Sequence, residues 1–305
     1  MWTWTIGSGG LIGSAINAQS RKPFTGPSIP WTEPEAAEQA LVRGLDDFAA
    51  AVAGDPWSIV WAAGAGTTAS PAEVFEPEIR TFSFFLEQLR LRAPSGLGVF
   101  GLISSAGGIH AGSPQPPFTE MTKPAPISAY GRAKLQQEQL LAQVLEHQFP
   151  SIVFRVSNAY GPGQNLDKLQ GLVSRLAVCT YRHEPVHLFV PVTTVRDYIF
   201  TSDIADRVHM WLEDPPTPQQ SPRTVVIASG TGTSIAQLVR IAGDVSHRRI
   251  PLAMGSHPSS KDQPADSRFI PTPLPTSHSP LATSMPVGVH AVFDDIAKRL
   301  ATGVP

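Results

Sequence analysis

The chain has 305 residues, a formal net charge of −2 and a charged fraction of 16%. This length can bury a large core, and the sequence has no basic run that would track a nucleic acid, so a small-molecule partner is expected instead. No stretch of about 18 apolar residues without breakers occurs and no secretion signal opens the chain, so we expect neither membrane insertion nor secretion.

The cysteine and histidine content narrows the class further. The single cysteine, Cys179, cannot form an internal disulfide, which fits a reducing, cytoplasmic location. The nine histidines show no HExxH spacing, and paired cysteines are absent, so no metal site is predicted. A G-x-S-x-G elbow of a serine hydrolase is also absent.

The first half of the chain alternates strand-like and helix-like segments, which is the pattern of a parallel sheet covered by crossover helices. The predicted strands cover 2–6, 58–62, 97–103 and 151–156, and the predicted helices cover 11–19, 35–53, 72–92 and 128–148. We therefore predict an α/β fold with a doubly wound parallel sheet over residues 1–160. Ligands are expected at the carboxyl ends of its strands.

Two regions fit this pattern less well. Three prolines interrupt residues 22–30, so only a short or edge strand is expected there. After about residue 160 the alternation loosens, with helices predicted over 165–180, 201–213 and 233–245 and a proline-rich loop over 251–286. Residues 161–305 are predicted to form mainly a smaller, loop-rich substrate-binding lobe, whose segments are free to return to the main sheet.

A glycine-rich turn follows the first predicted strand. Gly7, Gly10 and Gly13 form a G-x-x-G-x-x-G pattern, which permits a tight turn, a close approach of the backbone to a pyrophosphate, and close packing of helix on strand. The N–H groups of Leu11 and Ile12 at the start of the helix would face the phosphates. A dinucleotide cofactor is therefore predicted, with further contacts at the turn that follows the strand 58–62, formed by Ala63 and Gly64.

The residues just after this helix bear on the identity of the dinucleotide. An acidic residue that would bind the adenosine ribose is not evident about 20 residues after the turn. Arg21 and Lys22 stand there and are suited to a 2′-phosphate, which favours NADP over NAD. The alternative is that these two cations only face water on a surface loop.

The strongest chemical signal is the pair Tyr130 and Lys134 on the predicted helix 128–148. A four-residue separation places both side chains on one helical face. A phenol has a pKa near 10, too high for efficient proton exchange at neutral pH, and a fixed cation together with an oxidised nicotinamide would lower it. We therefore predict Tyr130 as the proton carrier and Lys134 as its activator.

A serine pair ends the strand before this helix. A hydroxyl there would orient a substrate oxygen toward Tyr130. Two alignments are possible with the family that these motifs resemble. In the first, His110 stands where that family has a tyrosine, and Ala106 then falls where it often has a catalytic Ser or Thr. The other selects Ser105, which we take as catalytic, with Ser104 as the alternative. His110 is either a loop residue or a substrate contact.

These motifs resemble the extended short-chain dehydrogenase/reductase superfamily, the NAD-dependent epimerase/dehydratase family. Two later segments, 154–163 and 195–205, resemble its R-x-x-N-x-Y-G-P and R-D-Y-I motifs. The resemblance implies a Rossmann fold, bound NAD(P), and a nucleotide-sugar substrate held by Asn158 and by Arg196 at its diphosphate. Arg268 is a further candidate phosphate ligand.

The resemblance also implies reversible hydride transfer at a carbinol or ketone carbon of a nucleotide sugar, by an epimerase or a ketoreductase. A 4,6-dehydratase is disfavoured because Ala106 and Gly107 stand where such enzymes carry an Asp-Glu pair. Many relatives form homodimers, for which the helices 72–92 and 128–148 are candidates. The alternative function is a non-catalytic dinucleotide-sensing or scaffold protein, suggested by the compressed second strand and by Ala106.

Overall fold

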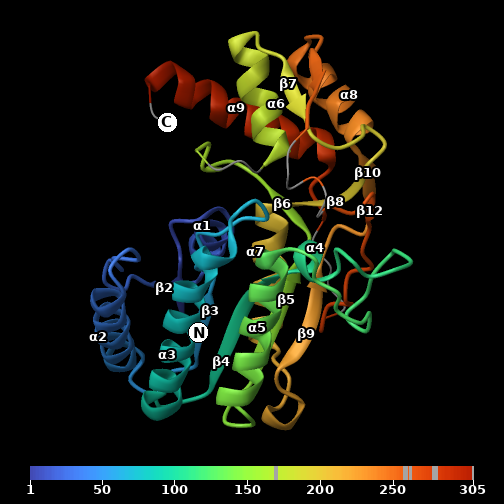
Figure 1. The fold of residues 1–305 in the computed structure, drawn as a ribbon. Helices are drawn as coiled ribbons and strands as arrows, with labels where there is room; N and C mark the ends of the chain where they lie inside the picture. The colour runs from blue at the N-terminus through green and yellow to red at the C-terminus, as the bar shows by residue number, and fades with distance from the viewer. Residues whose placement is uncertain (168–170, 257–259, 261–262, 277–280, 304–305) are drawn as a thin grey trace.

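The main sheet of the molecule has six parallel strands (Figure 1). The computed structural model describes residues 1–167, 171–256, 260, 263–276 and 281–303. In spatial order the strands are β2 (Lys22–Phe24), β1 (Trp2–Ile6), β3 (Trp57–Trp61), β4 (Gly98–Ser105), β5 (Ser151–Val156) and β9 (Arg223–Ile227). Because all neighbours pair in parallel, their carboxyl ends meet at one edge. The predicted doubly wound α/β fold is confirmed.

Helices cover both faces of this sheet (Figure 1). On one face α2 (Pro34–Val52), α3 (Phe75–Arg92) and α5 (Ala129–Val144) pack over a cluster rich in aromatic rings. On the other face α1 (Leu11–Gln19) and α7 (Thr201–Glu213) cover an aliphatic cluster. Along β3, Ile59 and Trp61 join the first cluster and Val60 joins the second, as the alternation of strand side chains requires. Burial on both faces explains the continuous apolar runs that predicted these strands.

The C-terminal half forms a smaller lobe above the carboxyl edge of the sheet (Figure 1). Its helices α6 (Leu172–Arg182), α8 (Ile235–Ser246) and α9 (Met285–Thr302) share one apolar cluster. Strands β10 (Gly232–Ser234), β8 (Val195–Phe200) and β12 (Asp266–Ser267) form a sheet in that order, and β6 (Asn158–Tyr160) also pairs with β8. A separate ribbon joins β7 (Val186–Leu188) to β11 (Leu252–Met254). Although α7 and β9 lie beyond residue 160, both pack with the main sheet.

Several predicted boundaries coincide with the structure and others do not. The strands 2–6 and 151–156 and the helices 11–19 and 201–213 match the observed elements. The helix predicted over 165–180 begins at Leu172, and residues 168–170 lie outside the described part of the chain. The helix α9 was not predicted, because it begins at Met285, within the proline-rich stretch 251–286 that was expected to be a loop. None of the described helices is long and apolar enough to span a bilayer.

Candidate functional site

The turn between β1 and α1 has the shape of an anion-binding loop. Gly7 has φ +91°, a conformation that favours glycine. A Cβ on Gly13 would overlap the carbonyl oxygen of Gly7, so α1 packs directly on the turn. The N-cap of α1 is Gly10, which provides no side-chain cap. The N–H groups of the first turn of α1 are thus suited to an outside anion such as a pyrophosphate.

The turn after β3 lies against this glycine turn. A Cβ on Gly7 would lie 2.6 Å from the backbone nitrogen of Ala63. A Cβ on the next residue, Gly64, would lie 3.7 Å from Nζ of Lys134 and 3.6 Å from Oε2 of Glu78. The predicted catalytic lysine therefore lies beside the same turn that borders the predicted cofactor site. The absence of a side chain at Gly7 lets the two turns pack directly on each other.

Tyr130 and Ser105 lie together where β4 and α5 meet this edge. Both side chains lie next to Gly108, where an added Cβ would be 2.9 Å from Cδ1 of Tyr130 and 3.2 Å from Oγ of Ser105, and the Ser105 Oγ accepts the Gly108 N–H at 3.1 Å. Burial raises the pKa of Tyr130, while the nearby Ser105 hydroxyl lowers it and the Glu78 carboxylate raises it further. With burial dominant, Tyr130 in the free protein carries its proton at neutral pH.

Lys134 lies one helical turn from Tyr130, as predicted from their spacing. Its Nζ donates to the Ile103 carbonyl at 3.3 Å and to Oε1 of Gln137 at 3.1 Å. Burial lowers the pKa of Lys134, while the carboxylates of Glu78 and Glu138 oppose this effect. Without a cofactor, the group that lowers the Tyr130 pKa is the Ser105 hydroxyl. The activating role of Lys134, which was expected together with an oxidised nicotinamide, stays a prediction.

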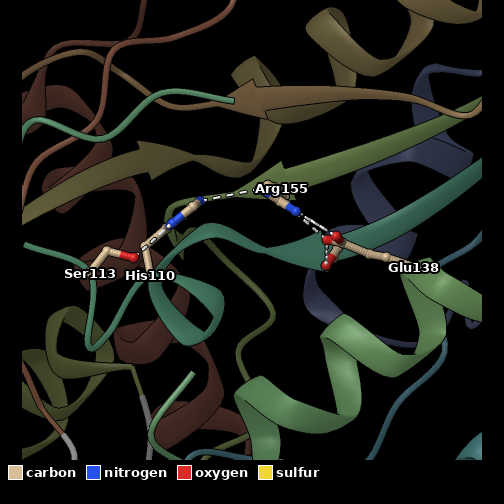
Figure 2. Close-up of polar contacts among 5 residues, drawn as sticks. His110, Ser113, Glu138 and Arg155 are labelled. Atoms are coloured by element: carbon tan, nitrogen blue, oxygen red, sulfur yellow. Dashed lines mark hydrogen bonds and ion pairs between the residues drawn. The ribbon is translucent and has the colours of Figure 1, made fainter. Parts of the chain in front are cut away.

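Ser104 points away from Tyr130 into a buried ionic cluster. Its Oγ donates to Oε1 of Glu138 at 2.6 Å, and Glu138 forms an ion pair with Arg155 at 2.7 Å (Figure 2). All three residues are buried. The structure therefore separates the two candidate serines: Ser105 reaches the tyrosine, whereas Ser104 ties β4 to α5 and β5.

His110 completes this cluster and is buried (Figure 2). Arginine only donates, so the Nε2 of His110, which lies 3.3 Å from NH1 of Arg155, must accept. Its Nδ1 then carries the proton and donates to Ser113 Oγ at 3.3 Å, which in turn donates to the Lys123 carbonyl at 2.8 Å. Burial and the Arg155 charge lower the pKa of His110 to about 4. His110 is thus a neutral structural residue, stacked on Phe118.

Asn158 lies at the first residue of β6, just beyond β5, and pairs in register with Tyr198. Its Nδ2 is buried and has no hydrogen-bond partner among the described residues. A buried amide without an acceptor costs free energy. The position therefore suits a ligand oxygen.

The two predicted phosphate-binding arginines lie close together in the small sheet. Arg196 in β8 stands opposite Ser267 of β12, and Arg268 is the next residue of that chain segment. At present both are engaged with the protein. NH1 of Arg196 donates to the carbonyls of Val195 and Pro264 at 2.9 and 2.7 Å, and Arg268 forms an ion pair with Asp266 at 2.8 Å.

Arg21 and Lys22 do not reach the cofactor edge, which corrects the basis of the NADP preference. Lys22 pairs in register with Trp2, the first residue of β1, and therefore lies at the amino edge of the sheet. There it contacts Asp55 at 3.2 Å, and Arg21 contacts Glu213 at 3.4 Å. Because β2 runs parallel to β1, only residues after its last position, Phe24, approach the glycine turn.

The sequence analysis missed two carboxylates near the site, and only one of them had a signal in the sequence. Glu78, in the first turn of α3, accepts the N–H groups of Ala65 and Gly66 at 2.8 Å each and so shapes the turn beside Lys134. Glu138 lies one turn after Lys134 on α5, where its spacing could have indicated a shared face. Across the described residues, no three His, Cys, Asp or Glu side chains gather in a way that could hold a metal ion.

The parallel sheet with an open glycine turn, and a tyrosine and a lysine one helical turn apart at its carboxyl edge, are the architecture of a dinucleotide-binding type of α/β protein. A family model described as "NAD dependent epimerase/dehydratase family" matches residues 45–228. The chain belongs to this family.

Similar proteins agree with this membership. A dTDP-L-rhamnose 4-epimerase from Burkholderia thailandensis is 32% identical over 41% of this chain and 34% of its own length. A dTDP-4-dehydro-6-deoxyglucose reductase from Escherichia coli is 31% identical over 37% of this chain and 36% of its own length. The matches thus span about a third of these relatives. A UDP-glucose 4-epimerase structure from Thermotoga maritima has the same fold, with a TM-score of 0.77 and 21% identity over 98% of this chain and 100% of that chain.

Because His110 is buried with a lowered pKa, we predict that the protein loses stability as the pH falls below about 6.5. Its folded-state pKa of about 4 lies below its ordinary value of 6.5, so the unfolded chain takes up the proton first as the pH falls. The stability contribution is therefore complete above pH 6.5 and is lost on the way down to about 4. Between about pH 7.5 and about pH 5 the loss should approach about 2 kcal/mol. Urea unfolding at both pH values measures it.

The control for this prediction is His110→Asn, which keeps an acceptor for Arg155 and a donor for Ser113 but does not titrate. The variant should lose about 2 kcal/mol less than the unmodified protein between the two pH values, whatever its own absolute stability. Equal losses in the two proteins would show that His110 is not held neutral.

Proposed function

We propose that this protein is an NAD(P)-dependent oxidoreductase or epimerase that acts at a carbinol or ketone carbon of a nucleotide sugar. The observation that carries the proposal is the position of Tyr130. Its ring and the Ser105 hydroxyl both lie next to Gly108, at the same sheet edge as the glycine turn, with Lys134 beside Gly64. A candidate proton carrier and a candidate dinucleotide site thus lie at one edge of the sheet.

The turn of Gly7 to Gly13, the start of α1, and the turn of Ala63 and Gly64 would hold the pyrophosphate and the nearby ribose. A bound nicotinamide would supply the hydride chemistry. Ser105 would orient the substrate oxygen, and Tyr130 would take its proton or return it. Lys134 lies one helical turn from Tyr130. If its ammonium group left Gln137 and approached the phenol, its positive charge would favour the tyrosinate.

Three residues near the carboxyl edge favour a diphosphate-linked sugar as the substrate. The unpartnered Nδ2 of Asn158 offers a donor to a sugar oxygen, and the neighbouring Arg196 and Arg268 offer two guanidinium groups to a diphosphate. Arg268 is the freer of the two, since its side chain is 47% exposed. Ala106 and Gly107 provide no extra acid or base, which favours epimerase or ketoreductase chemistry over 4,6-elimination.

Two features of assembly and location belong to the same proposal. A homodimer through α3 and α5 is inferred from the resemblance to the family. A cytoplasmic location is inferred from the single cysteine, Cys179, which is buried and free.

The experiment for the proposed function is Tyr130→Phe with UDP- or dTDP-sugars as substrates. Loss of the phenol proton should lower kcat/KM by about 10² to 10⁴-fold and leave the dinucleotide Kd unchanged, because general acid–base catalysis has this magnitude. Net NADPH consumption by the unmodified protein indicates a ketoreductase, and an isomer formed without net cofactor change indicates an epimerase. Full turnover by the variant would remove Tyr130 as the proton carrier. No turnover by the unmodified protein would favour the sensing or scaffold alternative.

A second prediction separates the two serines. Ser105→Ala removes the hydroxyl that would orient the substrate and should lower kcat/KM by about 10² to 10³-fold, with a stability loss of about 1 kcal/mol from the missing cap on the Gly108 N–H. Ser104→Ala leaves Oε1 of Glu138 short of a donor and should cost about 1–3 kcal/mol of stability while the folded protein stays active. Activity assays paired with urea unfolding test both. The reverse pattern would make Ser104 the catalytic serine.

A third prediction concerns the cofactor preference. Since Arg21 and Lys22 lie at the amino edge of the sheet, we propose that they do not select NADP. The double variant Arg21→Ala/Lys22→Ala should keep the ratio of kcat/KM for NADPH to that for NADH. A fall of about tenfold in that ratio, equal to about 1.4 kcal/mol, would reinstate them as 2′-phosphate ligands.

A further inference from the structure

The outer end of the main sheet differs from a full dinucleotide-binding fold. β2 is the edge strand, and residues 25–33 lead from it directly into α2, without another helix or strand in between. A full fold carries a further strand here. The surface that would receive the outer end of a dinucleotide must therefore come from residues 25–33.

One aromatic residue of this segment, Trp31, lies at the carboxyl edge of the sheet, near the proposed cofactor site. The indole of Trp31 packs against Trp61 in a T-shaped contact, with ring centroids 6.1 Å apart. Trp61 is the last residue of β3 and pairs in register with Ile6, the residue before the glycine turn. Trp31 is thus placed at the carboxyl edge, next to β1 and β3.

Trp31 packs on a buried residue, yet its own side chain is exposed to solvent. Trp61 is buried among Phe82 and Phe85, with centroids 5.1 and 5.2 Å away. The backbone of Trp31 is fixed by an N–H donated to the Ile29 carbonyl at 3.0 Å. Even so, Trp31 is 45% exposed, which is unusual for a large aromatic residue held on a buried one.

The chemistry of the segment suits a neutral, planar group. Residues 25–33, TGPSIPWTE, contain no cation and end in Glu33, so they offer no positive charge to a phosphate. A base stacks on an indole through its π-face alone, without needing hydrogen-bond partners. Because a dinucleotide seated on Gly7 to Gly13 has its phosphates at the start of α1, its adenosine end extends toward the β1–β2 side of the sheet.

We propose that Trp31 is the stacking platform for the adenine base of the dinucleotide, replacing the pocket that the missing strand would provide. This inference rests on the proposed function, since it requires that the glycine turn binds a dinucleotide. Trp31 acts here in binding and makes no contact with the reacting atoms.

The test measures binding of ADP-ribose and of nicotinamide mononucleotide by calorimetry in the full chain. Trp31→Ala should raise the Kd for ADP-ribose about tenfold, as expected for the loss of one base–aromatic stack. It should leave the Kd for nicotinamide mononucleotide, which has no adenine, unchanged. Trp31→Phe keeps a ring and should keep most of the affinity. The matched control is Phe189→Ala, which removes an aromatic residue of similar exposure, 42%, in the C-terminal lobe.

Fluorescence gives a second readout if Trp31→Ala folds poorly. ADP-ribose should change the indole emission of the unmodified protein, and most of that change should vanish in Trp31→Phe although the ligand still binds. Equal ADP-ribose affinity in a folded Trp31→Ala, or an undiminished emission change in Trp31→Phe, would overturn the role of Trp31. Failure of the unmodified protein to bind ADP-ribose would instead contradict the dinucleotide site itself.

Discussion

The parallel alignment of neighbouring strands is the constraint on which the site depends. Gly7, Gly64, Ser105 and Asn158 come from four distant parts of the chain, yet they lie at the carboxyl ends of β1, β3, β4 and β5, which are adjacent in the sheet. The contact of Gly7 with Ala63 fixes the first two of these turns against one another. A shift in the register of any one strand would separate the cofactor turn from the groups that are to act beside it.

A buried ion pair below the carboxyl edge of the sheet holds α5, the helix that carries Tyr130 and Lys134, in place. Glu138 of α5 and Arg155 of β5 lie one turn below Lys134, and Ser104 and His110 satisfy their remaining hydrogen-bonding groups. A buried ion pair contributes little net stability because desolvation offsets the attraction. Its effect here is geometric, since α5, β4 and β5 can meet in only one way that satisfies all four polar groups.

Sequence patterns predicted the parts of the molecule in which local chemistry and burial agree. The glycine turn, the continuous apolar strands and the four-residue spacing of Tyr130 and Lys134 each carry their own physical signal. Arg21 and Lys22 were assigned to the cofactor from their distance along the chain after the glycine turn. They stand at the start of the strand expected over 22–30, and the start of a parallel strand lies at the amino edge of the sheet. The choice between Ser104 and Ser105 needed the direction of each side chain at the strand end. Glu78 depends on a tertiary contact between α3 and the turn after β3, which no local pattern reports.

In the proposed function, Tyr130 is a buried, protonated phenol in the free protein and would become a proton carrier when NAD⁺ is bound. An ultraviolet titration of tyrosinate measures this change most directly, taken as the difference between the unmodified protein and Tyr130→Phe, with and without NAD⁺. Tyr130 should titrate above its ordinary pKa of 10.0 in the free protein and well below that value with NAD⁺, since a nearby positive charge favours the tyrosinate. A Tyr130 pKa that is unchanged by saturating NAD⁺ would rule out this role.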